Sequence, residues 1–306
     1  MIDLKVRIGK TIFKNPVWAA SGTFGNGEEF TDFLKITEIG AVVTKTVTRS
    51  PRRGNPVPRV VETPSGLLNS IGLENKGVEW FKKEQMPFLK ELGVGTIVSI
   101  AGETPEEFVE CAGKLTGKNR PDAIEINLSC PNVFHKGARR RLFAQDPKIT
   151  EKITKAVKKK IKCPVITKLT PNVTDIGEIA RAAENGGADA ISLVNTYFGM
   201  AVDAEEMRPV LGNVTGGVSG PAIKPMALAA VWSAYNEVSI PIIGIGGIMT
   251  GLDAAEFILA GASAIQVGTA NFIDPGRCAG VLKELKEYLN RKKIKRIRDL
   301  VGKLKV

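Results

Sequence analysis

The sequence predicts an α/β protein of the (β/α)8 TIM-barrel class, and three observations support this prediction. From about Val17 onward, short β-branched runs alternate with amphipathic helical segments, which is the pattern of parallel strands joined by helices. Eight such runs occur, the number that closes a barrel. The alternative, an open doubly wound sheet, has Gly-x-Gly-x-x-Gly after its first strand, whereas residues 21–25 read Ser-Gly-Thr-Phe-Gly.

The elements follow in a regular order along the chain. Residues 3–16 alternate around Gly9-Lys10 and predict a β-hairpin, which we expect to cover the bottom of the barrel. A chain of 306 residues can form one such domain, so we expect a single domain over 1–306. The predicted strands are Val17–Ser21, Ala41–Thr46, Thr96–Ala101, Ala123–Leu128, Pro164–Leu169, Ala190–Val194, Pro241–Gly246 and Ala264–Gly268.

Two connections are longer than a strand-to-helix link requires, and long loops in compact domains often carry function. Residues 47–95 contain four prolines before the segment 69–73, and we expect them to form a stiff excursion over the top of the barrel. The second connection, residues 131–146, precedes a helix predicted at 147–161. Its length and polarity are typical of a mobile lid.

The formal net charge of +11 is compatible with an anionic ligand, an acidic partner or nucleic acid. Much of the excess lies between Lys283 and Lys305, where Leu282, Leu285 and Leu289 have helical spacing, so we expect a solvated terminal helix there. Nucleic-acid binding is disfavoured because aromatic residues make up only 6% of the chain and do not alternate with basic ones.

Cysteine usage and apolar runs indicate the compartment. The four cysteines include no Cys-x-x-Cys pair and the chain has one histidine, which disfavours a metal cluster and a disulfide framework. We therefore expect no bound metal and a reducing, cytoplasmic location. The N-terminus lacks a signal-peptide pattern, and later apolar runs such as 240–248 are short and interrupted by glycine, so we expect no membrane span.

The strand predicted at Ala123–Leu128 carries polar side chains and is followed by a cysteine. Period-2 alternation places Glu125 and Asn127 toward the barrel interior, where polar groups require partners. Pro131 ends the strand pairing, so Cys130 is expected on a loop beside the strand tip, where a thiol can act as a base or nucleophile. A lone cysteine is more often a buried apolar residue, so this assignment depends on the other residues at the same end of the barrel.

Polar groups also end the other predicted strands, at the end of the barrel where (β/α)8 enzymes place their catalytic residues. Two of them are lysines at inward positions, and a lysine beside an apolar wall needs an anion such as a phosphate, a carboxylate or a reduced flavin. These strand ends are Ser21, Thr44-Lys45-Thr46, Asn127, Lys168, Asn195-Thr196, 244–247 and Gly268-Thr269.

Glycines follow the seventh and eighth strands, where such barrels bind phosphate through backbone N–H groups. They are Gly246-Gly247 and Gly268, and Ser219-Gly220-Pro221 adds a further glycine loop upstream. Tight turns explain these glycines equally well, so the residues alone leave both interpretations open.

Together these residues resemble the dihydroorotate dehydrogenase family, specifically the FMN-binding catalytic subunit of its NAD-linked two-subunit class, class 1B. The resemblance extends from Ile2 to about Leu285. The segments that carry it are 15–25, Thr44-Lys45-Thr46, 54–64, 69–73, 127–133, 168–175, Asn195-Thr196, 215–225 and 244–248.

The resemblance implies oxidation of dihydroorotate to orotate in pyrimidine biosynthesis. Cys130 would remove a proton from C5 while hydride passes from C6 to flavin N5, and activity would rise with pH because a free thiol has a pKa near ~8.5. FMN would be held by Ser21, Lys45, Thr46, Asn127, Lys168, Val194, Gly220, Gly246, Gly247, Gly268 and Thr269. The substrate would contact Lys45, Asn69, Ser70, Ile71, Gly72, Leu73, Asn127, Asn132, Asn195 and Thr196, where asparagine amides match the donors and acceptors of a pyrimidine.

The resemblance also implies partners. A homodimeric core would sit within a heterotetramer whose other subunit carries FAD and an iron–sulfur cluster, because this chain has neither a cluster of cysteines nor a dinucleotide fingerprint. The quinone-linked class uses a serine base, but the fumarate-linked class shares the cysteine. That class and a flavin-dependent dihydropyrimidine dehydrogenase stay as alternatives.

Two features depart from the family pattern. Ser99 stands where an asparagine near the flavin is common, so we leave it out of the expected site. Residues 134–143 are more basic than the glycine-rich lid of relatives.

Overall fold

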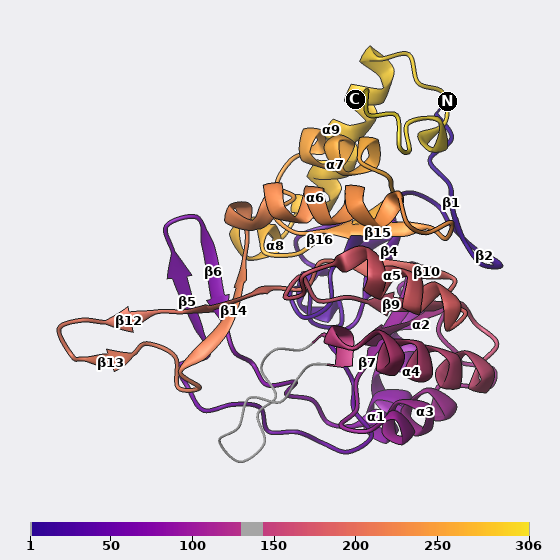
Figure 1. Cartoon of the computed structure of the whole chain (residues 1–306). Helices are drawn as coiled ribbons and strands as arrows, with labels where there is room; N and C mark the ends of the chain where they lie inside the picture. The colour runs from indigo at the N-terminus through magenta and orange to yellow at the C-terminus, as the bar shows by residue number, and fades with distance from the viewer. Residues whose placement is uncertain (1, 130–142, 306) are drawn as a thin grey trace.

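The computed structural model describes residues 2–129 and 143–305 and contains a closed barrel of parallel strands (Figure 1). Each barrel strand pairs with the next one along the chain, and the last pairs with the first, which confirms the predicted class. The barrel strands are β3 (Val17–Ala19), β4 (Ala41–Val43), β7 (Gly95–Ile100), β8 (Ala123–Asn127), β9 (Val165–Lys168), β10 (Ala190–Leu193), β15 (Ile242–Ile245) and β16 (Ala262–Val267).

The predicted hairpin is present and closes one end of the barrel. Strands β1 (Val6–Ile8) and β2 (Thr11–Phe13) pair in antiparallel fashion around Gly9-Lys10. Val6, Ile8 and Phe13 pack in one buried cluster with residues from all eight barrel strands. The hairpin therefore fills the bottom of the barrel with apolar side chains, as predicted.

The helices around the barrel begin where the sequence supplies caps. Asp146 accepts from Ile149 N–H at the start of α4 (Pro147–Lys160), and Thr250 forms a capping box with Asp253 at the start of α7 (Gly251–Leu259). The other α-helices are α1 (Val78–Trp80), α2 (Met86–Glu91), α3 (Pro105–Lys114), α5 (Ile176–Asn185), α6 (Lys224–Tyr235), α8 (Ala270–Ile273) and α9 (Arg277–Arg291). A π-helical turn η3 (Phe81–Gln85) joins α1 to α2, and 3-10 turns occur at η1 (Glu28–Phe30), η2 (Ile36–Glu38), η4 (Phe143–Gln145), η5 (Pro221–Ile223) and η6 (Ile297–Asp299).

A second, antiparallel sheet projects from the open end of the barrel (Figure 1). The long connection 47–95 contributes the hairpin of β5 (Val60–Thr63) and β6 (Gly66–Asn69). Strands β11 (Tyr197–Met200) and β14 (Thr215–Ser219) come from a third long insertion, between β10 and α6, which was not predicted from the sequence. This insertion also contains the short pair β12 (Val202–Asp203) and β13 (Arg208–Pro209). Two segments that are distant in sequence thus build one wall above the barrel.

The C-terminal segment is only partly solvated. Leu282, Leu285 and Leu289 of α9 are buried and belong to the same cluster as residues of α7, so the predicted amphipathic helix is confirmed. The chain then returns to the N-terminus, where Asp3 and Arg296 form an isolated parallel β-bridge through their backbones, and the two ends lie close together in Figure 1. Across residues 2–129 and 143–305, no helix combines the length and the apolar character that crossing a membrane requires.

Candidate active site

Inward-facing side chains change from apolar to polar partway along the barrel strands. On β8, Ala123 packs in the cluster at the closed end, and the next inward residues are Glu125 and Asn127, both buried. Four further strands make the same change over two residues: Ile97 and Ser99 on β7, Ile166 and Lys168 on β9, Ala190 and Ser192 on β10, and Ala264 and Gln266 on β16. A polar layer therefore forms the floor of the open end.

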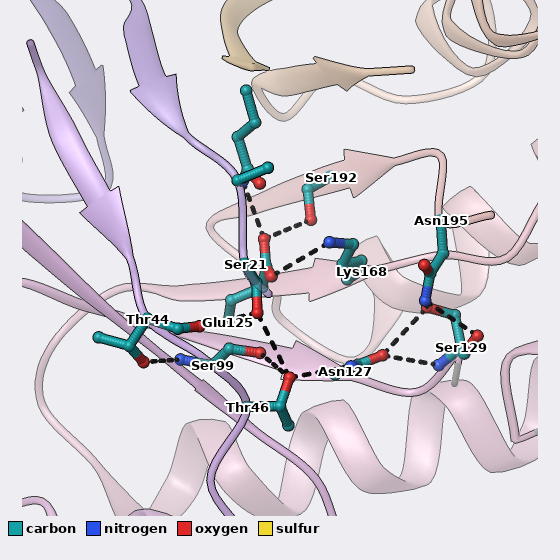
Figure 2. A network of polar contacts seen from close by, with 12 residues as sticks. Ser21, Thr44, Thr46, Ser99, Glu125, Asn127, Ser129, Lys168, Ser192 and Asn195 are labelled. Carbon is teal, nitrogen blue, oxygen red and sulfur yellow. Dashed lines mark hydrogen bonds and ion pairs between the residues drawn. The ribbon is translucent and has the colours of Figure 1, made fainter. Parts of the chain in front are cut away.

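Glu125 lies at the centre of this layer and is 0% exposed. Its Oε2 accepts hydrogen bonds from Ser192 Oγ and Gln266 Nε2, each at 2.9 Å. Its Oε1 lies 3.7 Å from Lys168 Nζ (Figure 2). The buried carboxylate is thus compensated by two neutral donors and one cation, as burial of a charge requires.

A row of hydroxyl groups continues the polar layer toward β3 and β4. Thr46 Oγ1 lies 2.9 Å from Ser99 Oγ and 3.4 Å from Ser21 Oγ (Figure 2). Ser21 Oγ also donates to Thr44 O at 2.7 Å, and Ser99 N–H donates to Thr44 Oγ1. These contacts orient the hydroxyl groups at the ends of three neighbouring strands.

Asn127 connects this row to the ends of β8 and β10. Its Nδ2 donates to Thr46 Oγ1 at 3.1 Å, and its Oδ1 accepts from Ser129 N–H and Ser129 Oγ. Asn195 Nδ2 donates to Ser129 Oγ at 2.9 Å and to Ser129 O at 3.0 Å (Figure 2). The orientation of both amides is set by neighbours on other strands, so their remaining donors and acceptors are held in place.

The open end of the barrel contains a cavity, and most of the predicted site residues line it. Every residue predicted to hold FMN lines the cavity. These residues are Ser21, Lys45, Thr46, Asn127, Lys168, Val194, Gly220, Gly246, Gly247, Gly268 and Thr269. Of the residues predicted to contact substrate alone, Asn69, Ile71, Gly72, Leu73, Asn195 and Thr196 also line it.

Ser70 is the described exception. Its side chain is fully buried away from the cavity, and its Oγ accepts from Asn55 Nδ2 at 2.9 Å and from Asn213 Nδ2 at 3.0 Å. Ser70 therefore connects the 69–73 loop to the second sheet. Cys130 and Asn132 lie outside the described residues, and so do residues 131–142 of the lid expected over 131–146.

Lys45 lies at the rim of the cavity beside an acidic residue. Its Nζ is 3.7 Å from Glu74 Oε2, which also accepts a hydrogen bond from Arg59 Nη1 at 3.0 Å. Lys45 and Glu74 are about one-third and one-half exposed, so water screens their attraction. An anionic ligand entering the cavity can compete with Glu74 for Lys45.

The glycine turns on the other side of the cavity require glycine. Gly220, Gly246 and Gly247 have φ values of 96°, 127° and 71°, which other residues rarely adopt. A Cβ on Gly246 would lie 2.8 Å from Ala227 Cβ, and one on Gly247 would lie 2.9 Å from Gly220 O. These turns bring the backbone close to the cavity without side chains between them, which is the arrangement that binds phosphate.

An ion-pair cluster supports these turns from behind. Lys224 Nζ donates to Asp253 Oδ1 at 2.6 Å and to Glu256 Oε2 at 2.8 Å, which raises the pKa of Lys224. Burial raises the pKa of Asp253, but hydrogen bonds from Lys224 and from the backbone N–H groups of Met249 and Thr250 outweigh that effect and leave it lowered. The cluster ties α6 to α7.

The three described cysteines are buried. Burial raises the pKa of Cys111 and of Cys278 to about 12, and it also raises that of Cys163. None of them lines the cavity. Of the four cysteines, these three therefore have the environment of structural residues.

Some residues of the site were not anticipated. Gln266 and Ser192 complete the Glu125 cluster, and Leu67 and Phe272 add to the cavity wall. Gln266 could have been predicted, since it occupies an inward position of a predicted strand. Leu67 could not, because only the pairing of β6 with β14 brings it to the cavity.

Comparison with known proteins gives a consistent result. The sequence model of the family described as dihydroorotate dehydrogenase matches residues 3–289. A protein of Geobacter sulfurreducens named dihydroorotate dehydrogenase B (NAD(+)), catalytic subunit, is 50% identical over 304 residues, covering 99% of each chain. Proteins of the same name from Bacteroides fragilis and Desulforamulus reducens are each 50% identical, over 306 residues (100% of each chain) and 301 residues (98% of each chain).

Proposed function

Since the chain belongs to the dihydroorotate dehydrogenase family, we propose that it oxidises dihydroorotate to orotate in pyrimidine biosynthesis and is the catalytic subunit of an NAD-linked enzyme. The observation that carries this proposal is the cavity at the open end, where Lys45, Lys168 and three asparagines meet beside glycine turns. That set offers cations for a carboxylate and a flavin, amides for a pyrimidine ring and a backbone site for a phosphate.

The cavity residues fit FMN. Gly220, Gly246 and Gly247 leave no room for a Cβ where the backbone approaches the cavity, which suits a phosphate. Lys168 reaches the cavity from the barrel floor with its side chain only 7% exposed. A cation in so dry a position stabilises negative charge far more than one in water does. Bound FMN supplies a hydride acceptor and holds two electrons.

We assign the substrate to the Lys45 side of the cavity. Lys45, Asn69, Asn127 and Asn195 line the cavity. In this proposal Lys45 binds the carboxylate of dihydroorotate, and the three amides match the ring's donors and acceptors. The backbone of 71–73 closes the same side. Asn132 and Ser70 join this set by the family resemblance, and the buried hydroxyl of Ser70 also holds the loop.

We assign the base to Cys130, the cysteine at the family's base position. Its thiolate takes the C5 proton, and the C6 hydrogen leaves with its electron pair, so one C–H bond breaks at each carbon and a double bond forms between them. The other three thiols do not compete for this role, because each is buried and has a raised pKa.

The two electrons then leave through a partner. The relatives are named as catalytic subunits of NAD(+) enzymes, and we propose the same assembly here: a homodimeric core bound to subunits that carry FAD and an iron–sulfur cluster, in the cytoplasm. A fumarate-linked enzyme would need no such subunit.

The cofactor and substrate are tested by spectroscopy of the purified chain. We expect one FMN per chain released on denaturation, and a perturbed flavin spectrum on titration with orotate but not with uracil. Anaerobic dihydroorotate should bleach the flavin. A colourless protein that gains no spectrum with added FMN would contradict the proposal, and a response to uracil alone would favour a dihydropyrimidine dehydrogenase.

Cys130→Ala should slow flavin reduction by dihydroorotate by about 10²- to 10⁴-fold, the usual contribution of a positioned base. Cys130→Ser should retain activity mainly at alkaline pH, because a hydroxyl loses its proton less readily than a thiol. Cys163→Ala is the matched control and should leave the rate unchanged. An unimpaired Cys130→Ala variant would refute the assignment of the base.

The electron acceptor is tested by co-expression with an FAD and iron–sulfur subunit. We expect NAD reduction only in the complex. A chain that is fully active with fumarate as a lone homodimer would overturn the NAD-linked assignment while leaving dihydroorotate oxidation intact.

A further inference from the structure

We propose that Glu125 is a positioning residue that restrains the charge of Lys168 and thereby lowers the reduction potential of the flavin; this inference rests on the proposed FMN site. Glu125 lies one layer below the cavity and does not line it. It therefore acts through Lys168, which lines the cavity and lies beside the carboxylate (Figure 2).

The two carboxylate oxygens of Glu125 have different surroundings. Oε2 is saturated by Ser192 Oγ and Gln266 Nε2, which hold the carboxylate in one orientation. Oε1 accepts no hydrogen bond from the residues the structure describes, and its neighbour is Lys168 Nζ at 3.7 Å. The oxygen left without a donor is thus the one that faces the lysine.

The separation of 3.7 Å makes this an ion pair without a hydrogen bond. Lys168 Nζ accordingly keeps its N–H donors available for the cavity while its charge is attracted toward the barrel floor. Both side chains are buried, at 0% and 7% exposure, so their attraction is screened much less than that of a surface pair.

In this arrangement the ammonium group of Lys168 interacts with two negative groups, the carboxylate of Glu125 and the reduced flavin. Reduced flavin is more negative than oxidised flavin, so a nearby lysine favours reduction. A fixed carboxylate behind that lysine opposes the effect, both by holding the ammonium group back and by its own negative field. Glu125 therefore lowers the potential at which the flavin accepts electrons, which suits an enzyme that must pass them onward to NAD.

The test is the two-electron midpoint potential of the FMN-loaded Glu125→Gln variant. Glutamine has the same shape and keeps an oxygen for the Ser192 and Gln266 donors, but it removes the charge. We expect reduced FMN to gain at least tenfold in binding relative to oxidised FMN, which is an upward shift of about 30 mV for a two-electron couple. A potential equal to that of the wild type would overturn the proposal.

Glu79→Gln is the matched control. Glu79 pairs with Lys114 at 2.7 Å on the outside of the barrel, so this variant makes the same change in net charge and also removes a lysine–glutamate pair. We expect its potential to equal that of the wild type. An equal shift in both variants would show a general effect of net charge and would overturn the specific role of Glu125.

Glu125→Asp distinguishes an effect of Glu125 on the charge of Lys168 from a purely structural role of Glu125 in the barrel. Aspartate keeps the charge but withdraws it by one methylene from Lys168, so we expect an upward shift smaller than that of Glu125→Gln. If Glu125→Gln does not fold, this variant decides the question: an upward shift supports the proposal and an unchanged potential refutes it.

The affinity of the apoproteins for oxidised FMN separates this inference from the proposed function. We expect Glu125→Gln to bind FMN, since Gly220, Gly246 and Gly247 are unaffected. If the wild type binds no FMN, the proposed function fails. If the wild type and the variant bind FMN with identical potentials, only the role of Glu125 fails.

Discussion

The same strands form both halves of the barrel interior, but the half at the closed end is apolar and the half at the open end is polar. At the closed end, Ile166 of β9 packs with Ile8 and Phe13 of the hairpin, and the whole layer is apolar. Two residues further along β9, Lys168 faces the same way and enters a layer of carboxylate, amide and hydroxyl groups. Both layers have the same strand backbone. They differ in their surroundings, because the hairpin covers the closed end and the cavity lies at the open end.

The comparison shows how a barrel can be both stable and chemically active. The hairpin removes water from the closed end, where only apolar side chains are buried without loss. At the open end, burial of Glu125 and Lys168 costs free energy, which their ion pair and the hydrogen bonds from Ser192 and Gln266 to Glu125 offset. Substitutions in the two layers should therefore affect different properties.

The largest effect is expected in the apolar layer. Ile166→Ala removes a fully buried side chain and should lower the free energy of unfolding by about 2–5 kcal/mol, measured by urea denaturation. FMN and orotate affinities of the folded protein should be unchanged. The control is Ile12→Ala on the hairpin, a half-exposed position that should change stability by less than about 0.5 kcal/mol. Lost flavin binding in stable Ile166→Ala protein would break the separation of the two layers.

Lys168→Ala, two residues away, should act on chemistry. We expect anaerobic flavin reduction by dihydroorotate to slow by about 10²- to 10³-fold, the usual loss when one preorganised electrostatic group is removed. Stopped-flow absorbance at saturating substrate measures the rate. Lys152→Ala on the exposed face of α4 is the control and should match the wild type. A rate for Lys168→Ala within a few-fold of the wild type would remove Lys168 from the reaction.

The ion pair outside the barrel should affect stability without changing the flavin potential. Asp253→Asn removes the charge that binds Lys224 and weakens the cap of α7, so we expect a loss of about 1–2 kcal/mol at neutral pH, with an unchanged flavin potential. Asp299→Asn, at an exposed pair with Arg296, should have little effect. A potential that moves with Asp253→Asn would contradict the distinction between inner and outer ion pairs.

The pH dependence of this loss has a defined sign. The folded-state pKa of Asp253 is lowered from 3.8, so its stabilisation is complete above that pH and disappears as the pH falls through the folded pKa. The pKa of Lys224 is raised from 10.5, so its share is complete below that pH and disappears as the pH rises through the folded pKa. The stability difference between wild type and Asp253→Asn should therefore shrink in acid.

The smallest effect concerns the rim of the open end. Glu74→Gln removes the carboxylate that competes for Lys45, so orotate should bind more tightly, by up to about fivefold, because exposed pairs contribute about 0–1 kcal/mol. The gain should decline as salt is added. Glu103→Gln, which loses a similar pair with Arg52, is the control and should bind orotate like the wild type. Weaker orotate binding in Glu74→Gln would show that Glu74 supports Lys45 rather than competing with it.

Strand positions were predictable because each strand is a short β-branched run, and every barrel strand lies within a few residues of its predicted range. The inward direction of Glu125 followed from period-2 alternation alone. The second sheet was not predictable, since β11 and β14 contain glycines and form only by pairing with each other and with β6. The burial of the Ser70 hydroxyl was not predictable for the same reason, because its side-chain partner Asn213 lies 143 residues away.

The sequence by itself determined the order of strands and helices, the hairpin at the closed end and the set of polar residues that end the strands, because propensity, capping and side-chain alternation act over a few residues. Only the tertiary structure decided which of those polar residues meet. Glu125, Ser192 and Gln266 come from strands up to 141 residues apart, and closure of the barrel is what brings them within hydrogen-bonding distance.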